Sequence, residues 1–111
     1  MSGTLKRLAG PAYLSNSAAD VLAAPASGTR YIVRHIHIAN EDSSARTFSL
    51  FLGATGGSSG GTSLFPTKSI PANDVYDWYC YLEMTSSDYL SGLASVASKL
   101  VITVAGEKQY L

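Results

Sequence analysis

Charged side chains are scarce in this sequence, and neither sign dominates. They make up 14 % of the 111 residues, whereas about 25 % is usual in soluble domains. Eight Lys and Arg balance eight Asp and Glu, so the chain lacks the basic excess with which proteins displace counterions from nucleic acids. We therefore expect no nucleic-acid partner. The low charge also indicates a surface that is partly covered by something other than water.

Cysteine is nearly absent, and long apolar runs are missing. Cys80 is the single cysteine, which excludes a disulfide framework within one chain and a zinc site of the Cys-Cys type. No apolar run approaches the roughly 18 residues of a membrane span, and residues 1–7 hold no apolar core of signal-peptide length. We therefore expect no membrane partner, and none of these features calls for a cofactor.

The sequence is instead dominated by strand patterns. Apolar residues make up 46 % of the chain, and they alternate with polar residues instead of recurring at helical spacing. Four long strands are predicted at residues 31–40, 47–53, 74–84 and 100–105, and four shorter ones at 12–15, 20–24, 63–65 and 89–91. About eight strands at roughly 8- to 12-residue spacing predict an all-β, single-domain antiparallel β-sandwich that is jelly-roll-like, with a closed barrel as the alternative.

Turn and loop signals separate the predicted strands. The link 41–45 is short and polar and predicts a hairpin between the strands on either side of it. Pro66 is expected at a strand end, where its missing N–H does little harm. The Gly- and Ser-rich stretch 54–62 predicts a surface loop, because a phosphate-binding loop needs a helix start and usually a Lys close behind its glycines. Residues 91–95 fit one helical turn at most.

Two units are expected along the chain. Residues 1–10 lie outside the strand pattern and are predicted to form an N-terminal arm, whereas residues 11–111 form the β-sandwich domain. The arm carries Lys6 and Arg7, and our hypothesis is that it becomes ordered against a neighbouring subunit or a larger particle. Lys6 and Arg7 are therefore candidate interface residues. The alternative interpretation is a frayed terminus.

His35 and His37 form the sharpest chemical pattern. Residues i and i+2 of a strand share a face, and two neighbouring imidazoles can bind Zn²⁺, Fe²⁺ or Mn²⁺. With Gly28 before them and Glu41 after them, they resemble the first metal motif of cupin barrels. However, the chain has no third histidine, Gly28 is one residue out of register, and Glu41 fits a loop tip better. We therefore expect no metal and two hydrogen-bonded rings on a strand face, and keep His35, His37 and Glu41 as the alternative metal site.

The predicted strand 74–84 carries four of the eleven aromatic residues. Alternation places one set of side chains on the core face: Tyr76, Trp78, Cys80 and Leu82. The other set is expected to be exposed: Asp77, Tyr79, Tyr81 and Glu83. Tyr79 and Tyr81 suit a protein interface better than a sugar platform, because no other exposed aromatic cluster is evident. The core-side position of Cys80 predicts a buried, unreactive thiol.

Five stretches carry a family likeness: PAYLSNSAAD (residues 11–20), PASGTRYIVRHIHIAN (25–40), FSLFLGATGG (48–57), SIPANDVYDW (69–78) and DYLSGLAS (88–95). Together they resemble small virion proteins of tailed bacteriophages, most strongly those of phages that infect actinobacteria. The likeness covers most of the chain, from Pro11 to its C-terminal end, and its motifs are structural rather than catalytic. It implies an accessory structural protein of the virion, assembled in the cytoplasm of the host bacterium.

The expected function is therefore non-enzymatic, with capsid decoration or cement ahead of a minor tail or baseplate component. The expected partners are copies of the chain itself, in a closed oligomer that the resemblance implies to be a trimer, and phage capsid or tail proteins. A carbohydrate or host-surface binding module that uses Trp78, Tyr79 and Tyr81 is the second class of function. A cupin-like metal enzyme is the third class of function.

Overall fold

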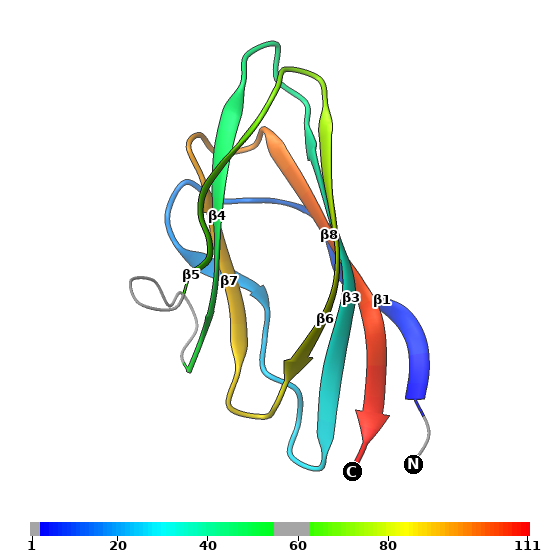
Figure 1. The fold of residues 1–111 in the computed structure, drawn as a ribbon. Helices are drawn as coiled ribbons and strands as arrows, with labels where there is room; N and C mark the ends of the chain where they lie inside the picture. The colour runs from blue at the N-terminus through cyan, green and yellow to red at the C-terminus, as the bar shows by residue number, and fades with distance from the viewer. Residues whose placement is uncertain (1–2, 55–62) are drawn as a thin grey trace.

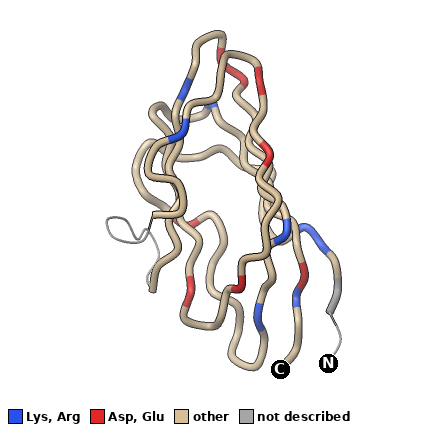
Figure 2. Tube along the Cα trace, viewed as in Figure 1, with Lys and Arg blue, Asp and Glu red and all other residues tan. Residues whose placement is uncertain are grey.

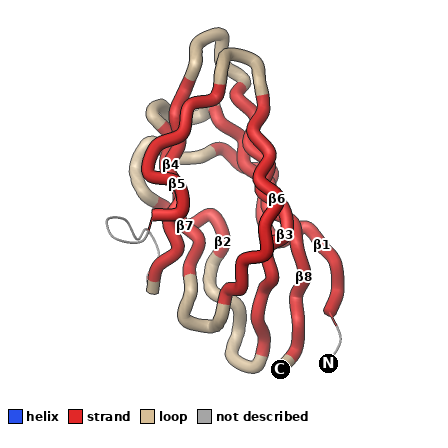
Figure 3. The backbone as a smooth tube through the Cα atoms, viewed as in Figure 1, coloured by secondary structure: helices blue, strands red, loops and turns tan. Residues whose placement is uncertain are grey.

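The computed structural model describes residues 3–54 and 63–111, and this part of the chain contains strands and loops but no helix (Figures 1 and 3). Most of the predicted loop 54–62 lies outside the described residues. The eight strands are β1 (Gly3–Tyr13), β2 (Ala19–Leu22), β3 (Thr29–Asn40), β4 (Arg46–Gly53), β5 (Ser63–Ile70), β6 (Val75–Met84), β7 (Tyr89–Ala94) and β8 (Leu100–Tyr110). The described residues include no helix of the length and apolarity that a membrane crossing requires.

The strands form two four-stranded antiparallel sheets that face each other (Figure 1). One sheet has the order β1-β8-β3-β6 and the other has the order β2-β7-β4-β5. Strands pair from the two ends of the chain inward, β1 with β8, β2 with β7, β3 with β6 and β4 with β5. This nested pairing is that of a double-sheet jelly roll. The predicted all-β jelly-roll sandwich is confirmed, and the closed barrel is excluded because each sheet keeps two edge strands.

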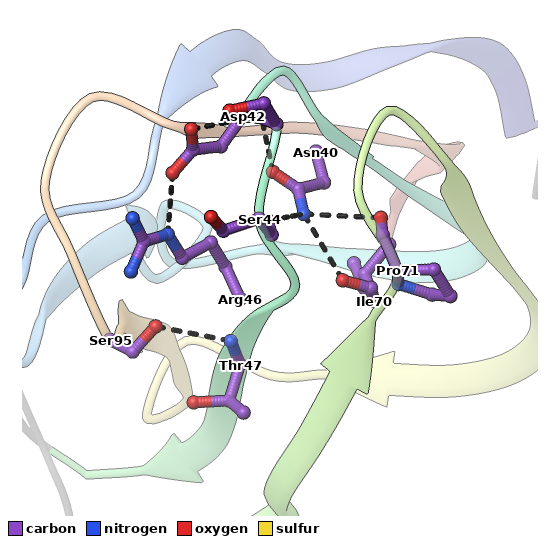
Figure 4. A network of polar contacts seen from close by, with 9 residues as sticks. Asn40, Asp42, Ser44, Arg46, Thr47, Ile70, Pro71 and Ser95 are labelled. Carbon is purple, nitrogen blue, oxygen red and sulfur yellow. Dashed lines mark hydrogen bonds and ion pairs between the residues drawn. The ribbon is translucent and has the colours of Figure 1, made fainter.

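The link between β3 and β4 is a corner between the sheets, so the predicted hairpin at residues 41–45 is wrong. The buried Asn40 amide organises this corner (Figure 4). Its Nδ2 lies 3.0 Å from the carbonyl oxygen of Ser44 and 3.1 Å from those of Ile70 and Pro71, and its Oδ1 accepts the N–H of Asp42 at 2.9 Å. The Asn40 side chain thereby satisfies backbone groups in the link between β3 and β4 and at the end of β5, where the chain crosses to β6. Without hydrogen-bond partners these groups would be costly to bury.

Three local expectations are corrected by the strand bounds. Residues 91–95 do not form a helical turn, because β7 continues as a buried strand to Ala94. Pro66 lies inside β5 rather than at its end, and it is tolerated there because β5 is an edge strand with a register shift. Residues 3–10 are in β1 and pair with β8, so the expected boundary at residue 10 falls inside a strand.

The core lies between the sheets and is closed on one side by aromatic rings. Its fully buried side chains include Ile36, Ile38, Phe48, Leu50 and Met84, each worth about 1.5–3 kcal/mol on burial. At the β6–β5 side, the Trp78 ring stands edge-on to Phe65, with centroids 4.9 Å apart, and Tyr76 contacts Phe48 and Phe65. The predicted core face of 74–84 is confirmed, since Tyr76, Trp78, Cys80 and Leu82 all pack against this core.

Candidate functional site

A β-bulge in β3 sets the direction of both histidines. The pairing of β3 with both neighbours shifts between Val33 and His35. Against β8, these two residues pair with adjacent residues, which leaves Arg34 as the extra residue on β3, whereas against β6 the extra residue is on β6. Val33 therefore faces the core together with Ile36, while His35 and His37 point away from the second sheet. We call this side of the β1-β8-β3-β6 sheet the outer face. Without the bulge, Val33 and the two histidines would share one side of the strand.

On the outer face, the two imidazoles meet one carboxylate. His37 lies directly opposite Asp77 in the β3–β6 pairing, and its Nδ1 is 2.6 Å from Asp77 Oδ1. His35 Nε2 is 2.8 Å from the same oxygen. The hydrogen bonds from His37 and His35 lower the pKa of the Asp77 carboxyl below its ordinary value. Because an ionised carboxylate only accepts, both ring nitrogens donate, which places a proton on His35 Nε2 and on His37 Nδ1.

Tyr79 and Tyr81 lie on the same outer face, exposed by 74 % and 72 %. The Tyr79 ring stacks on His35 with centroids 4.3 Å apart and planes 4° from parallel. The Arg34 guanidinium carbon lies 5.5 Å from the centroid of the Tyr81 ring. The rings are therefore held in position although they face solvent. Trp78 points to the opposite side of β6, so the three-ring platform expected for a carbohydrate binder does not form.

Two ion pairs lie on the outer face beside the first half of β3. Arg30 Nη1 lies 2.7 Å from Glu83 Oε2, and Arg34 Nη1 lies 2.9 Å from Glu107 Oε2. Ile32 lies in register between Glu83 and Glu107 and is only 1 % exposed. Exposed ion pairs are worth only about 0–1 kcal/mol each, so their main effect here is to cover Ile32 with aliphatic stems and to hold charge in a fixed pattern.

Large apolar side chains are exposed on one side of the molecule. Five of them lie on the outer face by their register: Leu5, Tyr13, Val75, Tyr79 and Tyr81. Two more, Tyr110 and Leu111, lie at the end of β8. Within the described residues, the strands of the β2-β7-β4-β5 sheet expose no large apolar side chain to the same degree. The charged residues in strands also gather on the β1-β8-β3-β6 sheet (Figure 2).

Glu41 is not part of the histidine cluster. Its Oε1 accepts the phenolic O–H of Tyr13 at 2.8 Å, and this bond raises the pKa of Tyr13 above its ordinary value. The carboxylate that contacts His35 and His37 is Asp77, whereas the alternative metal site expected from the sequence contains Glu41. The sequence indicates that Asp77 is on the exposed side of its strand, but no signal in it shows that this strand pairs with the one that carries His37.

Lys6 and Arg7 both lie in β1, opposite Gly106 and Ala105 of β8. Alternation gives them different sides of the strand. Arg7 shares the outer face with Leu5, and Lys6 points to the other side. In this structure the two cations thus belong to a paired edge strand of the sandwich, and Arg7 alone of the two borders the cluster of exposed apolar side chains.

Two further features complete the chemistry of the described residues. A small cleft of about 90 Å³ at the β1–β2 edge is lined by residues such as Tyr13, Ser15 and Asp20, and its lining holds no His, Cys, Lys or Arg. Burial raises the pKa of the Cys80 thiol, whose Sγ donates to the Val33 carbonyl at 3.4 Å. The thiol therefore stays protonated near neutral pH, in agreement with the predicted unreactive cysteine.

Comparisons with known proteins identify the fold and no family. No family model matches the chain, and no curated protein matches it. A solved subunit from Bacillus endospore appendages, described as a novel family of disulfide-linked pili, is similar with a TM-score of 0.61 at 13 % identity, over 99 % of this chain and 89 % of that one. Two crystal structures of a pentameric capsid protein from metagenomic phage sequences align with TM-scores of 0.35 and 0.36 at 14 % identity. This chain covers 62 % and 59 % of their lengths. At these identities the likeness to the appendage subunit establishes a shared fold.

Proposed function

We propose that this chain is a non-enzymatic structural subunit, an accessory protein of a tailed-phage virion that decorates and cements the capsid surface. The observation that carries the proposal is the one-sided exposure of large apolar side chains on the outer face. Monomeric soluble proteins seldom gather such side chains on one face without a partner. The five residue stretches that resemble small phage virion proteins supply the class of particle.

The outer face has the make-up of a protein interface. Tyr79 and Tyr81 are rigid, amphipathic rings of the kind that is enriched at interfaces, and the ion pairs Arg30–Glu83 and Arg34–Glu107 form a polar border. The sheet also ends in two unpaired edges, β1 and β6, which a partner strand could extend. Weak contacts of this kind, repeated on every subunit, add through multivalency.

We propose a homotrimer that is assembled through this face and binds the particle as one unit. Closed cyclic symmetry is the usual form of such oligomers. The appendage pili show that this fold also occurs in a disulfide-linked fibre. Cys80 is the single cysteine of these 111 residues, so they supply one intermolecular disulfide per chain at most. A continuous disulfide-linked fibre is therefore a poor analogy, and the contacts proposed here are non-covalent.

Sedimentation velocity of the double variant Tyr79→Ser, Tyr81→Ser tests the contact. We expect a trimer for the wild type and a shift to monomer for the variant, because serine removes the exposed rings but leaves the core face of β6 unchanged. Tyr110→Ser is the matched control, since Tyr110 is exposed but lies at the end of β8. A monomeric wild type, or a double variant that remains trimeric, would overturn the proposed face.

Copy number tests the role in the particle. Quantitative mass spectrometry of purified virions from the genome that encodes this chain should find very many copies, as a decoration protein requires. A few copies per particle would instead assign the chain to the tail or baseplate. Absence from the particle would contradict the virion role altogether.

A further inference from the structure

We propose that His35, His37 and Asp77 form a binding site for a divalent transition-metal ion of the Zn²⁺ class on the outer face. The three side chains each offer one ligand atom, and these atoms all lie within 4.8 Å of one another. His35 Nε2 and His37 Nδ1 are the nitrogens that contact Asp77 Oδ1. This site is independent of the proposed virion role, and it differs from a cupin centre because it lies on the outside of the sandwich.

The donor set suits this class of ion. Imidazole nitrogens combined with one carboxylate oxygen are typical ligands of Zn²⁺, and two imidazoles make Mg²⁺ and Ca²⁺, which prefer all-oxygen sites, poor occupants. The ionised carboxylate supplies one negative charge beside the cation. When each imidazole binds the metal through the nitrogen that now donates to Asp77, its proton moves to the other ring nitrogen, and the uptake of one ion replaces the two hydrogen bonds of His35 and His37.

The geometry needs only side-chain movement. The two nitrogen–oxygen distances are 2.8 and 2.6 Å, whereas ligand atoms around a tetrahedral Zn²⁺ with bonds near 2.0 Å are about 3.3 Å apart. The three side chains are 30–38 % exposed, so their rings and carboxylate can turn apart by this amount while the strands stay in place. The pairing of β3 with β6 holds their Cα atoms in register.

Neighbouring groups support the ligands and leave one side open. The stack of Tyr79 on His35 restrains the orientation of that ring, as outer-shell contacts do at metal sites. Among the described residues, the cluster contains no fourth His, Cys, Asp or Glu. The remaining coordination position therefore faces outward and takes water, as in three-ligand zinc sites.

Zinc titration of the tag-free chain, by calorimetry with a chelator competition as a check, tests the site. We expect one Zn²⁺ per chain in the wild type. Asp77→Asn and His37→Gln should each weaken binding by at least about tenfold, because removal of an outer-shell partner alone already costs about that much. Glu83→Gln is the matched control, because Glu83 is a carboxylate on the same face of β6 but pairs with Arg30 outside the cluster.

Two results would overturn the site. One is a wild type that binds no Zn²⁺, and the other is a variant of His37 or Asp77 that binds as tightly as the wild type. Substitution by Co²⁺ supplies a readout apart from affinity: a tetrahedral site with imidazole ligands gives intense visible absorption, whereas Co²⁺ scattered over surface carboxylates gives only the weak bands of an octahedral aquo complex. Zinc binding by a chain that sediments as a monomer would support this site while contradicting the proposed oligomer, so the two proposals fail separately.

Discussion

His37 and Asp77 face each other across β3 and β6 with Nδ1 2.6 Å from Oδ1, although they lie 40 residues apart in the chain. β6 is an edge strand whose single neighbour in its sheet is β3. A directly opposed polar pair on such a strand favours one register over its alternatives. The same contact thus fixes β6 against β3 and brings together the donor atoms that we assign to a metal ion.

Trp78 is one of the aromatic rings that close one side of the core, so we expect Trp78→Ala to cause a large loss of stability. Trp78 is partly buried against Phe65, so we expect a loss near the lower end of the range for buried aromatic residues, about 3 kcal/mol. Urea unfolding followed by circular dichroism measures it. Tyr79→Ala, one residue along the strand on the exposed side, should cost less than about 1 kcal/mol. Equal losses for the two variants would contradict the assignment of Trp78 to the core face.

Substitution of two glycines distinguishes the cost of an unfavourable backbone conformation from the cost of a steric overlap. Gly10 and Gly28 both have positive φ, 78° and 84°, so alanine at either position costs roughly 1–2 kcal/mol in conformational energy. A Cβ at Gly10 would also overlap the carbonyl oxygen of Ile102, whereas a Cβ at Gly28 would meet nothing within 4 Å. We therefore expect Gly10→Ala to be more destabilising than Gly28→Ala in chemical denaturation. The reverse order would contradict the close packing of β1 on β8.

The corner at Asp42 predicts a pH-dependent contribution to stability. The hydrogen bond from Arg46 Nε, at 2.6 Å, lowers the pKa of the Asp42 carboxyl below its ordinary value of 3.8. A lowered folded-state pKa stabilises the fold above the ordinary pKa, and this contribution is lost as the pH falls through the folded-state value. Asp42→Asn should therefore be less stable than the wild type near pH 7, and the difference should be smaller at a pH well below the ordinary pKa of 3.8. A difference that is the same at both pH values would contradict the ion pair.

The environment of Cys80 predicts slow thiol chemistry. Burial raises the pKa of its thiol, and the thiolate is the reactive form. A disulfide-exchange reagent at mildly alkaline pH should react much more slowly with the native chain than with the urea-unfolded chain. Equal rates would show that β6 is not held against the core at this position.

Much of the fold could be predicted because alternation is strong in β3 and in the edge strand β6. In both strands, apolar side chains recur against the core and exposed residues stand between them. Both strands also end close to the residues at which the sequence predicts their ends. β1 could not be predicted in full, because Pro11 and two glycines interrupt its pattern and pairing with β8 supplies the missing stability.

The candidate site was predictable only in part. Neighbouring histidines on a strand indicate a shared face, but the direction of that face depends on the bulge at Arg34, which alternation does not reveal. The third member, Asp77, depends on which strands pair. A jelly roll pairs strands that are distant in the chain, so local signals such as the short link 41–45 suggest a hairpin that the topology does not contain.

Native mass spectrometry of the tag-free protein, after Zn²⁺ is added and the excess is removed by dialysis, tests the assembly surface and the metal site together. It reads subunit number and bound metal in one spectrum. We expect a closed trimer that assembles through Tyr79 and Tyr81, with one ion retained per chain at His35, His37 and Asp77. A chain that stays monomeric over the accessible concentration range would contradict the claim that the outer face is an assembly surface.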